Sequence, residues 1–195
     1  MPDSTTSLRL EIAAAAARLI ADGGHDYAGA KRKAALEICG ARPSRGALPD
    51  NDQIDEALRE HLDLFDEDHP ARVRALRETA LELMDELAEY APLVTGAAWK
   101  GIAAEHAPLH LQLFPDNAKE VEYWLLNRHI EFDVDTIGHF RGRDEVPVLA
   151  LLWQDTPVML SLYDPDDQRG ALHEGTRGAQ RGTRQGLLAR MKDET

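Results

Sequence analysis

Apolar residues in the first part of the chain recur with the spacing of an α-helix. They fall three or four positions apart in four segments, which cover residues 7–22, 26–38, 51–65 and 70–90. Asn51 or Asp52 is suited to cap the third segment, and Pro70 is suited to the first turn of the fourth. This pattern predicts a helical N-terminal segment over residues 1–66, followed by a long helix.

After residue 92 the pattern changes, because apolar and polar residues begin to alternate. This period of two predicts strands over residues 93–95, 109–114, 130–137, 146–153 and 156–163. Asn117 and Glu120 have capping-box spacing for an intervening helix over residues 116–128, and Gln154-Asp155 is a hairpin turn. We therefore predict an α+β chain in which the N-terminal helices precede a mixed β-sheet with flanking helices, over residues 68–195.

The composition is that of an ordinary globular protein. Of the 195 residues, 43% are hydrophobic and 29% are charged, so the chain can bury a real core. No apolar run approaches the roughly 20 residues of a membrane helix, and the N-terminus lacks the pattern of a secretory signal. The single cysteine, Cys39, fits a reducing compartment. We expect a cytoplasmic protein that does not bind membranes.

The charge is strongly acidic overall but basic near the C-terminus. A net charge of −13 argues against general nucleic-acid binding, because such a surface repels phosphate backbones at long range. From residue 169 onward, six Arg or Lys face three acidic residues. Glycines in this segment expose backbone N–H groups, and Arg169, Arg177 and Arg181 offer forks that match phosphate oxygens. The alternative is a solvated C-terminal tail.

The segment GAAWKGIAAEHAPLHL, residues 96–111, resembles the nucleotidyltransferase fold of the DNA polymerase β-like superfamily. Small members of that family read like GSRARGTATPDSDIDL. Gly96, Gly101, Ala103 and Leu111 coincide with this pattern without a gap, and Lys100 keeps a basic position. The resemblance covers about residues 68–137 and implies a domain built for metal-dependent nucleotidyl transfer.

The family's metal ligands are replaced in this chain. The resemblance implies a serine at position 97 and aspartates at 108 and 110, which are here Ala97, Pro108 and His110. Asp133, or Glu131, is the one candidate left for a third carboxylate on a neighbouring strand. Since Mg²⁺ prefers oxygen ligands, a histidine with one carboxylate is a poor site for it. We expect a degenerate active site and a pseudoenzyme without a metal cofactor.

Other segments, such as LHLQLFPDNAKEVEYWLLNRHIEFDV, are similar to a group of bacterial proteins described as nucleotidyltransferase-like. Some members of that group are labelled UDP-N-acetylmuramate–alanine ligase. Such ligases bind ATP through a glycine-rich loop that ends in GK[ST]. The nearest approach here, from Gly96 to Gly101, lacks the lysine and the hydroxyl after the second glycine. The label is therefore not supported by the residues.

Two polar groups on the predicted strands are candidates for chemistry. His110 and Asp133, if they lie on adjacent strands, form a general acid–base pair, whereas the simpler interpretation is a half-buried strand histidine. The acidic row of Glu131, Asp133 and Asp135 holds a cation or is the wet face of a two-faced strand. Trp99 stacks on a bound base or packs into the core.

These observations lead to two functional hypotheses. The first is a catalytically inactive module that binds a nucleotide, a partner protein or a second copy of itself. Its expected ligand-binding residues are Gly96, Trp99, Lys100, Arg169 and Arg177. The alternative is a nucleotidyltransferase with a rearranged site, in which His110, Asp133 and the C-terminal arginines act together and Mg²⁺ is required.

Overall fold

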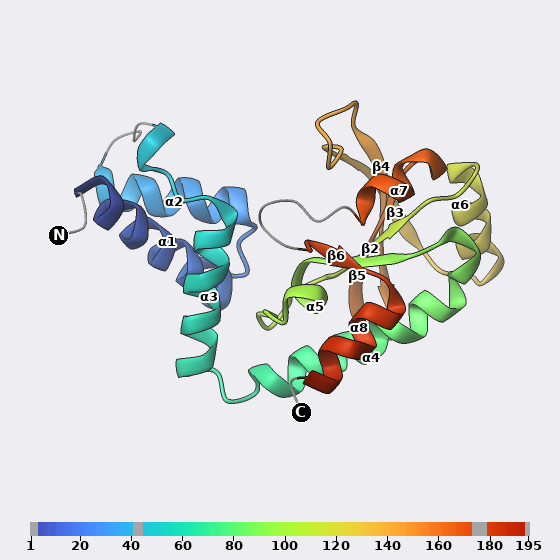
Figure 1. The fold of residues 1–195 in the computed structure, drawn as a ribbon, viewed down its shortest axis with the longest axis horizontal. Helices are drawn as coiled ribbons and strands as arrows, with labels where there is room; N and C mark the ends of the chain where they lie inside the picture. The colour runs from blue at the N-terminus through green and yellow to red at the C-terminus, as the bar shows by residue number, and fades with distance from the viewer. Residues whose placement is uncertain (1–3, 41–44, 173–178, 194–195) are drawn as a thin grey trace. The chain divides into compact units, whose positions relative to one another are not determined.

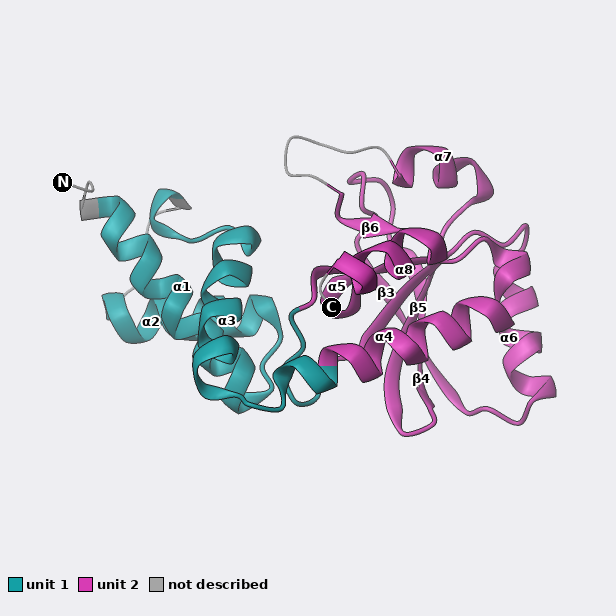
Figure 2. Cartoon of the chain, turned by 60° about the horizontal axis from the view of Figure 1, so that its bottom comes forward, with its two compact units in different colours: residues 1–72, 102–106 teal, residues 73–101, 107–195 magenta. Residues whose placement is uncertain are grey.

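The computed structural model describes residues 4–40, 45–172 and 179–193 and divides the chain into two compact units (Figures 1 and 2). Residues 1–72 and 102–106 belong to the first unit, and residues 73–101 and 107–195 belong to the second. The first unit thus extends six residues beyond the expected end at residue 66 and includes a short segment from the middle of the chain. The predicted α+β class, with helices at the N-terminus, is confirmed.

Three helices form the first unit: α1 (Ser4–Gly23), α2 (Tyr27–Cys39) and α3 (Asn51–Phe65), with a 3-10 turn at Arg45–Ala47. Their core is rich in alanine, which allows the helices to approach one another closely. The N-cap of α3 is Asp50, not Asn51 or Asp52 as expected. Its carboxylate accepts from the N–H of Gln53, and the Gln53 side chain accepts from the N–H of Asp50, which is a complete capping box.

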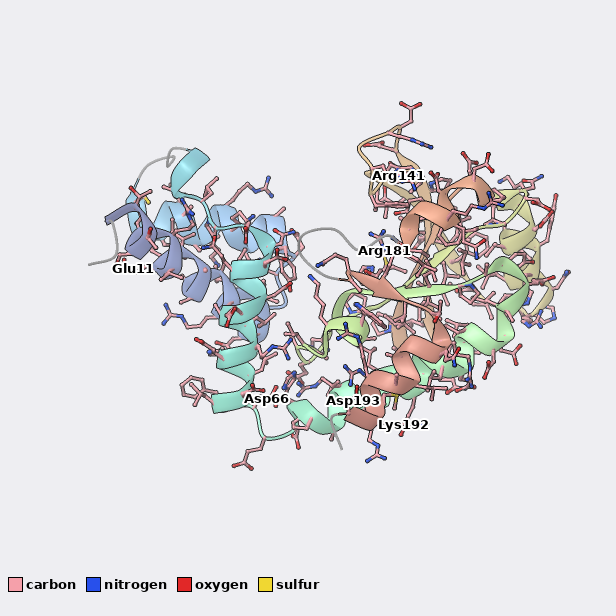
Figure 3. All side chains as sticks on the ribbon, in the orientation of Figure 1. Glu11, Asp66, Arg141, Arg181, Lys192 and Asp193 are labelled. Atoms are coloured by element: carbon pink, nitrogen blue, oxygen red, sulfur yellow. The ribbon has the colours of Figure 1, made fainter. Side chains whose placement is uncertain are left out.

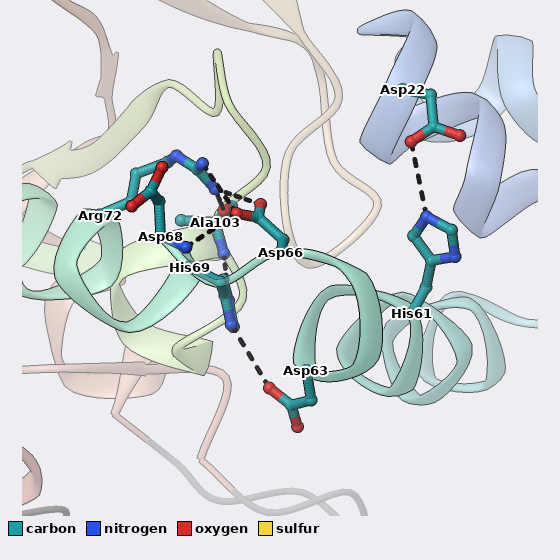
Figure 4. Close-up of polar contacts among 8 residues, drawn as sticks. All are labelled: Asp22, His61, Asp63, Asp66, Asp68, His69, Arg72 and Ala103. Atoms are coloured by element: carbon teal, nitrogen blue, oxygen red, sulfur yellow. Dashed lines mark hydrogen bonds and ion pairs between the residues drawn. The ribbon is translucent and has the colours of Figure 1, made fainter.

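The segment 102–106 is held to the first unit by polar contacts (Figure 4). Arg72 donates to the carbonyl of Ala103 at 3.0 Å and to the Asp66 carboxylate at 2.7 Å. The N–H of Ala103 donates to Nε2 of His69 at 3.3 Å, so the ring proton lies on Nδ1, which faces Asp63 at 3.4 Å. Ile102 and Ala104 are buried in the alanine-rich core.

The second unit contains the longer α4 (His69–Glu86, from residue 73), α6 (Ala118–Asn127) and α8 (Arg184–Asp193), with two short helices, α5 (Gly96–Lys100) and α7 (Gln168–Ala171). The helix predicted over residues 70–90 ends earlier, and its last turn is a 3-10 helix at Ala88–Tyr90. A further 3-10 turn covers Pro165–Asp167. Residues 96–100 are helical, and Gly101 ends this helix with a left-handed C-cap.

The strands are β1 (Leu93–Thr95), β2 (Leu109–Leu113), β3 (Phe132–Ile137), β4 (Val146–Trp153), β5 (Thr156–Leu162) and β6 (Arg181–Gly182). They form one mixed sheet in the order β3-β4-β5-β2-β1-β6. The pairs are antiparallel except for β2 and β5, which are parallel. Gln154 and Asp155 have φ values of 47° and 67°, so the predicted two-residue hairpin turn is of the left-handed kind that suits strand twist.

The two faces of this sheet differ. One carries the apolar residues of the central strands, including Leu111, Leu160 and Leu149, which are fully buried. Trp124 of α6 stacks on Trp153 of β4 at 6.1 Å, so α6 covers this face. The other face, called here the polar face, carries His110 and Gln112 of β2 and the residues that pair with them. No helix in the described part of the chain is long and apolar enough to span a membrane.

Candidate functional site

One row of paired residues crosses the polar face from edge to edge. Register places six residues at corresponding positions of the six strands, in the order Arg181, Thr95, His110, Met159, Ala150 and Asp133. Because residues opposite one another in a sheet project from the same face, all six belong to the polar face. The row shows directly which of the expected site residues are neighbours.

His110 and Asp133 do not lie on adjacent strands, so the expected acid–base pair is not formed. Strands β5 and β4 separate them, which corresponds to about 14 Å at the usual strand spacing. Strand β2 pairs with β1 on one side and with β5 on the side towards β3, and the residues of β5 on the polar face near His110 are Met159 and Ser161. The expected third carboxylate is therefore absent from this neighbouring strand, and Asp133 is exposed on the edge strand β3.

Gly96 does meet His110. Its φ of +64° is left-handed, and a Cβ added there would lie 3.1 Å from Cδ2 of the His110 ring. Glycine thus allows β1 to turn into α5 directly over the histidine. Burial lowers the pKa of His110, so the ring is neutral at neutral pH. Pro108, at the other position expected to carry a metal ligand, precedes β2 and is half-buried.

Trp99 lies in the core and leaves no ring face open to a base. It is 5% exposed, and its indole N–H donates to the carbonyl of Ala179 at 2.7 Å. A Cβ at Gly182 would lie only 2.1 Å from the ring, so the tryptophan packs directly on the backbone of β6. The Arg190 guanidinium covers the ring at 4.0 Å. Of the two interpretations of Trp99, core packing describes this position; Lys100 follows it at the end of α5 and is half-buried.

A buried carboxylate organises the loop between β3 and β4. Asp167 is 2% exposed and accepts from Nε2 of His139 at 2.9 Å. The N–H of Arg141 donates to Nδ1 of the same ring at 2.9 Å, so Nδ1 is the acceptor and Nε2 is the nitrogen that donates to Asp167. Arg143 and Arg141 also reach Asp167, at 3.0 and 3.4 Å. The hydrogen bond from His139 is the main cause of the lowered pKa of Asp167, and these charges add to it.

Arg181 lies close to this loop and is incompletely paired. Its guanidinium stacks over Phe140 at 4.4 Å, and one terminal nitrogen donates to the carbonyl of Ala171 at 3.0 Å. Its Nε is buried and has no hydrogen-bond partner among the described residues. Burial lowers the pKa of Arg181, and the nearby positive charge of Arg141 adds to that effect. Figure 3 labels the two arginines, which come from β6 and from the loop before β4.

Tyr163 contacts Gln112 and lies close to Arg181. Nε2 of Gln112 donates to its hydroxyl at 3.5 Å, and its ring packs edge-on against His139 at 5.2 Å. Burial raises the pKa of Tyr163, while Arg181 acts in the opposite direction. Gln112 is 5% exposed, and its Oε1 also has no hydrogen-bond partner within the described ranges. A buried donor on Arg181 and a buried acceptor on Gln112 are thus both available close to Tyr163.

The residues described above form an arginine-rich cluster of Arg141, Arg143, Arg181, Asp167, Tyr163 and Gln112. Most of them were not among the sequence-based candidates. Arg181 was considered for phosphate binding, whereas Arg141, Gln112 and Tyr163 were not singled out. The sequence FRGRDE, residues 140–145, contained a usable signal, because two arginines flank a glycine in a turn. Of the expected tail residues, Arg169 is exposed on α7, and Arg177 lies outside the described residues.

The described residues contain no group of three His, Cys, Asp or Glu side chains arranged to hold a metal ion. The cluster is instead suited to hydrogen-bond an anion, because guanidinium N–H groups are donors and outnumber the one carboxylate among them. Comparison with known proteins does not assign a family: no protein-family model matches the sequence, and no curated protein is similar to it.

Proposed function

We propose that the chain is a nucleotide-binding module, with a nucleotidyltransferase-like scaffold, that carries out no transfer reaction of its own. The phosphates of the ligand lie against Arg181 and Arg141, and Gln112 receives a hydrogen bond from an N–H or O–H group of the nucleoside. The observation that carries this proposal is the buried Nε of Arg181, which has no partner among the described residues. Leaving such a donor unpaired is costly, and a ligand oxygen would satisfy it.

The charge distribution favours a small anion at this cluster. The chain as a whole carries −13 and repels extended polyanions, but the guanidinium groups of the cluster attract a small anion at short range. Arginine forks bind phosphate oxygens through paired hydrogen bonds, with more geometric specificity than a lysine provides. Phe140 holds the Arg181 fork in place from one side.

The proposal of an inactive module is supported by the side chains around His110. Its neighbours in the row are Thr95 and Met159, neither of which can supply a charged oxygen to a divalent ion. The alternative, a rearranged transferase, needs His110 and Asp133 to act together, and two strands separate them. We therefore do not retain that alternative.

Calorimetric titration of the full chain with a nucleoside triphosphate tests the proposal. Arg181→Gln removes the charged hydrogen bond, so we expect affinity to fall about tenfold to a hundredfold. Arg74→Gln is the matched control, since Arg74 is exposed and pairs with Glu78 on α4, outside the cluster. Equal binding by the two variants, or no binding by the wild-type chain, would contradict the proposal.

A second variant tests which part of the ligand Gln112 contacts. Gln112→Leu removes the buried acceptor but no charge. We expect it to weaken binding of the nucleoside triphosphate while leaving binding of inorganic triphosphate unchanged. Equal losses for both ligands would show that Gln112 does not contact the nucleoside, and circular dichroism checks that each variant is folded.

A further inference from the structure

Strand β3 is an open edge of the sheet. It pairs with β4 on one side, and no strand of the described chain pairs with its other side. Four of its residues, 133–136, are exposed, so neither face is covered along this stretch. A row of unpaired backbone groups on such an edge is a template for the addition of another strand.

Backbone directions define where pairing is possible. The N–H of Thr136 is bonded to the carboxylate of Asp135 at 2.8 Å, so it points away from β4. Because these directions alternate along a strand, the N–H and C=O groups of Phe132 and Val134 also point outward. The Asp135 carboxylate already accepts the outward N–H of Thr136. The outward backbone groups of Phe132 and Val134 are therefore the ones with which a partner strand can pair.

The edge is bordered by an open groove that is lined by both apolar and acidic side chains. Residues from α6, the loop after it, β3 and β4 line this groove, among them Leu126, Ile130, Phe132, Leu151 and Leu152. Leu152 is 64% exposed on the face that carries Asp133, and Val134 is 61% exposed on the opposite face, so apolar surface is uncovered on both faces beside the unpaired backbone. An added strand would bury this surface.

The two sides of β3 require different side chains from an added strand. Phe132 and Val134 project from one face, and Glu131, Asp133 and Asp135 belong to the other by alternation. Cross-strand neighbours interact on the same face, so the partner needs apolar residues beside Val134 and positive residues beside the acids. A segment in which Lys or Arg alternates with apolar residues meets both requirements.

A second copy of this chain does not meet these two requirements for the added strand. An antiparallel pair of β3 strands centred on Val134 would place Asp133 opposite Asp135 of the other copy, twice. Like charges directly opposite in a sheet are destabilising. Each copy would also bring its whole charge of −13.

We propose that β3 and its groove bind an extended basic segment of a partner protein by strand addition. The partner pairs with the backbone around Phe132 and Val134, places apolar residues over the groove and places Lys or Arg beside Asp133 and Asp135. This surface lies on the edge opposite β6, and its function does not depend on the nucleotide proposal.

The test uses the full chain and three synthetic peptides, followed by amide hydrogen exchange in NMR spectra. The first alternates Lys and Val over seven residues, the second replaces Lys by Glu, and the third is the Lys peptide with alternate backbone amides N-methylated. We expect the first to slow exchange at Val134 and Phe132. At low salt it should bind at least about tenfold more tightly than the acidic peptide. N-methylation should abolish binding, because it removes the pairing groups while keeping the charge.

Variants of β3 provide the matching controls on the protein side. Val134→Pro removes one outward N–H, which edge strands tolerate, and should prevent binding of the first peptide. The double variant Asp133→Asn/Asp135→Asn should bind the basic peptide more weakly but still by backbone pairing. Equal binding of basic and acidic peptides, or binding of the N-methylated peptide, would overturn the proposal. So would dimerisation of the protein alone that Val134→Pro abolishes.

Discussion

At the scale of single residues, Gly96 shows how one backbone conformation holds β1, α5 and His110 together. We expect Gly96→Ala to destabilise the fold by roughly 2–3 kcal/mol. The alanine would be held at a positive φ, and its Cβ would make a close contact with the His110 ring. Gly142→Ala is the control: its φ is +69°, but nothing lies within 4 Å of the added Cβ. Urea unfolding of both variants measures the difference, and equal costs would mean that the His110 contact is unimportant.

His110 should make stability depend on pH in a defined direction. Burial lowers its folded pKa below the ordinary value of 6.5, so the unfolded chain takes up this proton first as the pH falls. Stability therefore decreases as the pH falls below about 6.5 and levels off below the folded pKa, and this group does not affect stability well above about pH 6.5. Between about pH 7.5 and about pH 5.5, His110→Gln should lose less stability than the wild type, by up to about 1.4 kcal/mol, which is the free energy of one pKa unit.

The pKa of His69 in the first unit is also lowered by burial, so the wild-type curve alone does not isolate His110. His69 is present in both proteins of the comparison, and its contribution cancels in the difference. Parallel stability curves for the wild type and His110→Gln would contradict the assignment.

At the scale of elements, the β4–β5 hairpin turns on two non-glycine residues with positive φ, Gln154 and Asp155. Two-residue turns of this kind favour glycine at the second position. We expect Asp155→Gly to stabilise the chain by roughly 0.5–1 kcal/mol, because it relieves the left-handed strain. Thermal unfolding measures the change, and a lower midpoint for this variant would argue against the strain. Asp155→Ala, which keeps the strain, serves as the control.

The elements that local periodicity defines were predictable from the sequence. Strands β1 and β4 have the predicted bounds, and β2, β5 and α6 differ by one or two residues at their ends. The short α5 and α7 were not predicted, because a helix of four or five residues is too brief to show a period. Strand β6 is two residues long and is defined by its pairing with β1.

The order of the strands was not predictable, and the main error about the candidate site follows from that. The parallel pairing of β2 with β5 joins segments about fifty residues apart. Alternation identifies each strand and its two faces but does not identify its neighbour. Once β5 takes the place beside β2, the β3 strand moves to the edge and Asp133 moves away from His110. The contacts among Arg141, Asp167 and Arg181 depend on the same long-range arrangement.

At the scale of the whole molecule, the division into units does not follow the chain continuously. Residues 102–106 belong to the first unit although the residues on both sides belong to the second. We expect Arg72→Gln to speed hydrogen exchange in 102–106, because it removes the bonds from Arg72 to Ala103 and Asp66. Arg74→Gln, two residues away and exposed, should leave these amides unchanged. Unaltered exchange in Arg72→Gln would show that apolar packing alone holds the segment.

The proposed nucleotide binding rests on the overall charge together with the local arginine cluster. The chain is acidic overall, with guanidinium groups gathered near Tyr163. It should bind a small phosphate-bearing ligand through these arginines, without a bound metal ion. A free triphosphate carries more negative charge than its magnesium complex. A site in which arginines surround a single carboxylate, Asp167, should therefore prefer the free form.

The most direct test of this account is a calorimetric titration of the wild-type chain with a nucleoside triphosphate, once in excess chelator and once in excess Mg²⁺. The account predicts that binding occurs in chelator, with an affinity at least equal to that measured with Mg²⁺. Binding that appears only when Mg²⁺ is present would contradict it, because such binding requires a metal site that the arginine cluster does not provide.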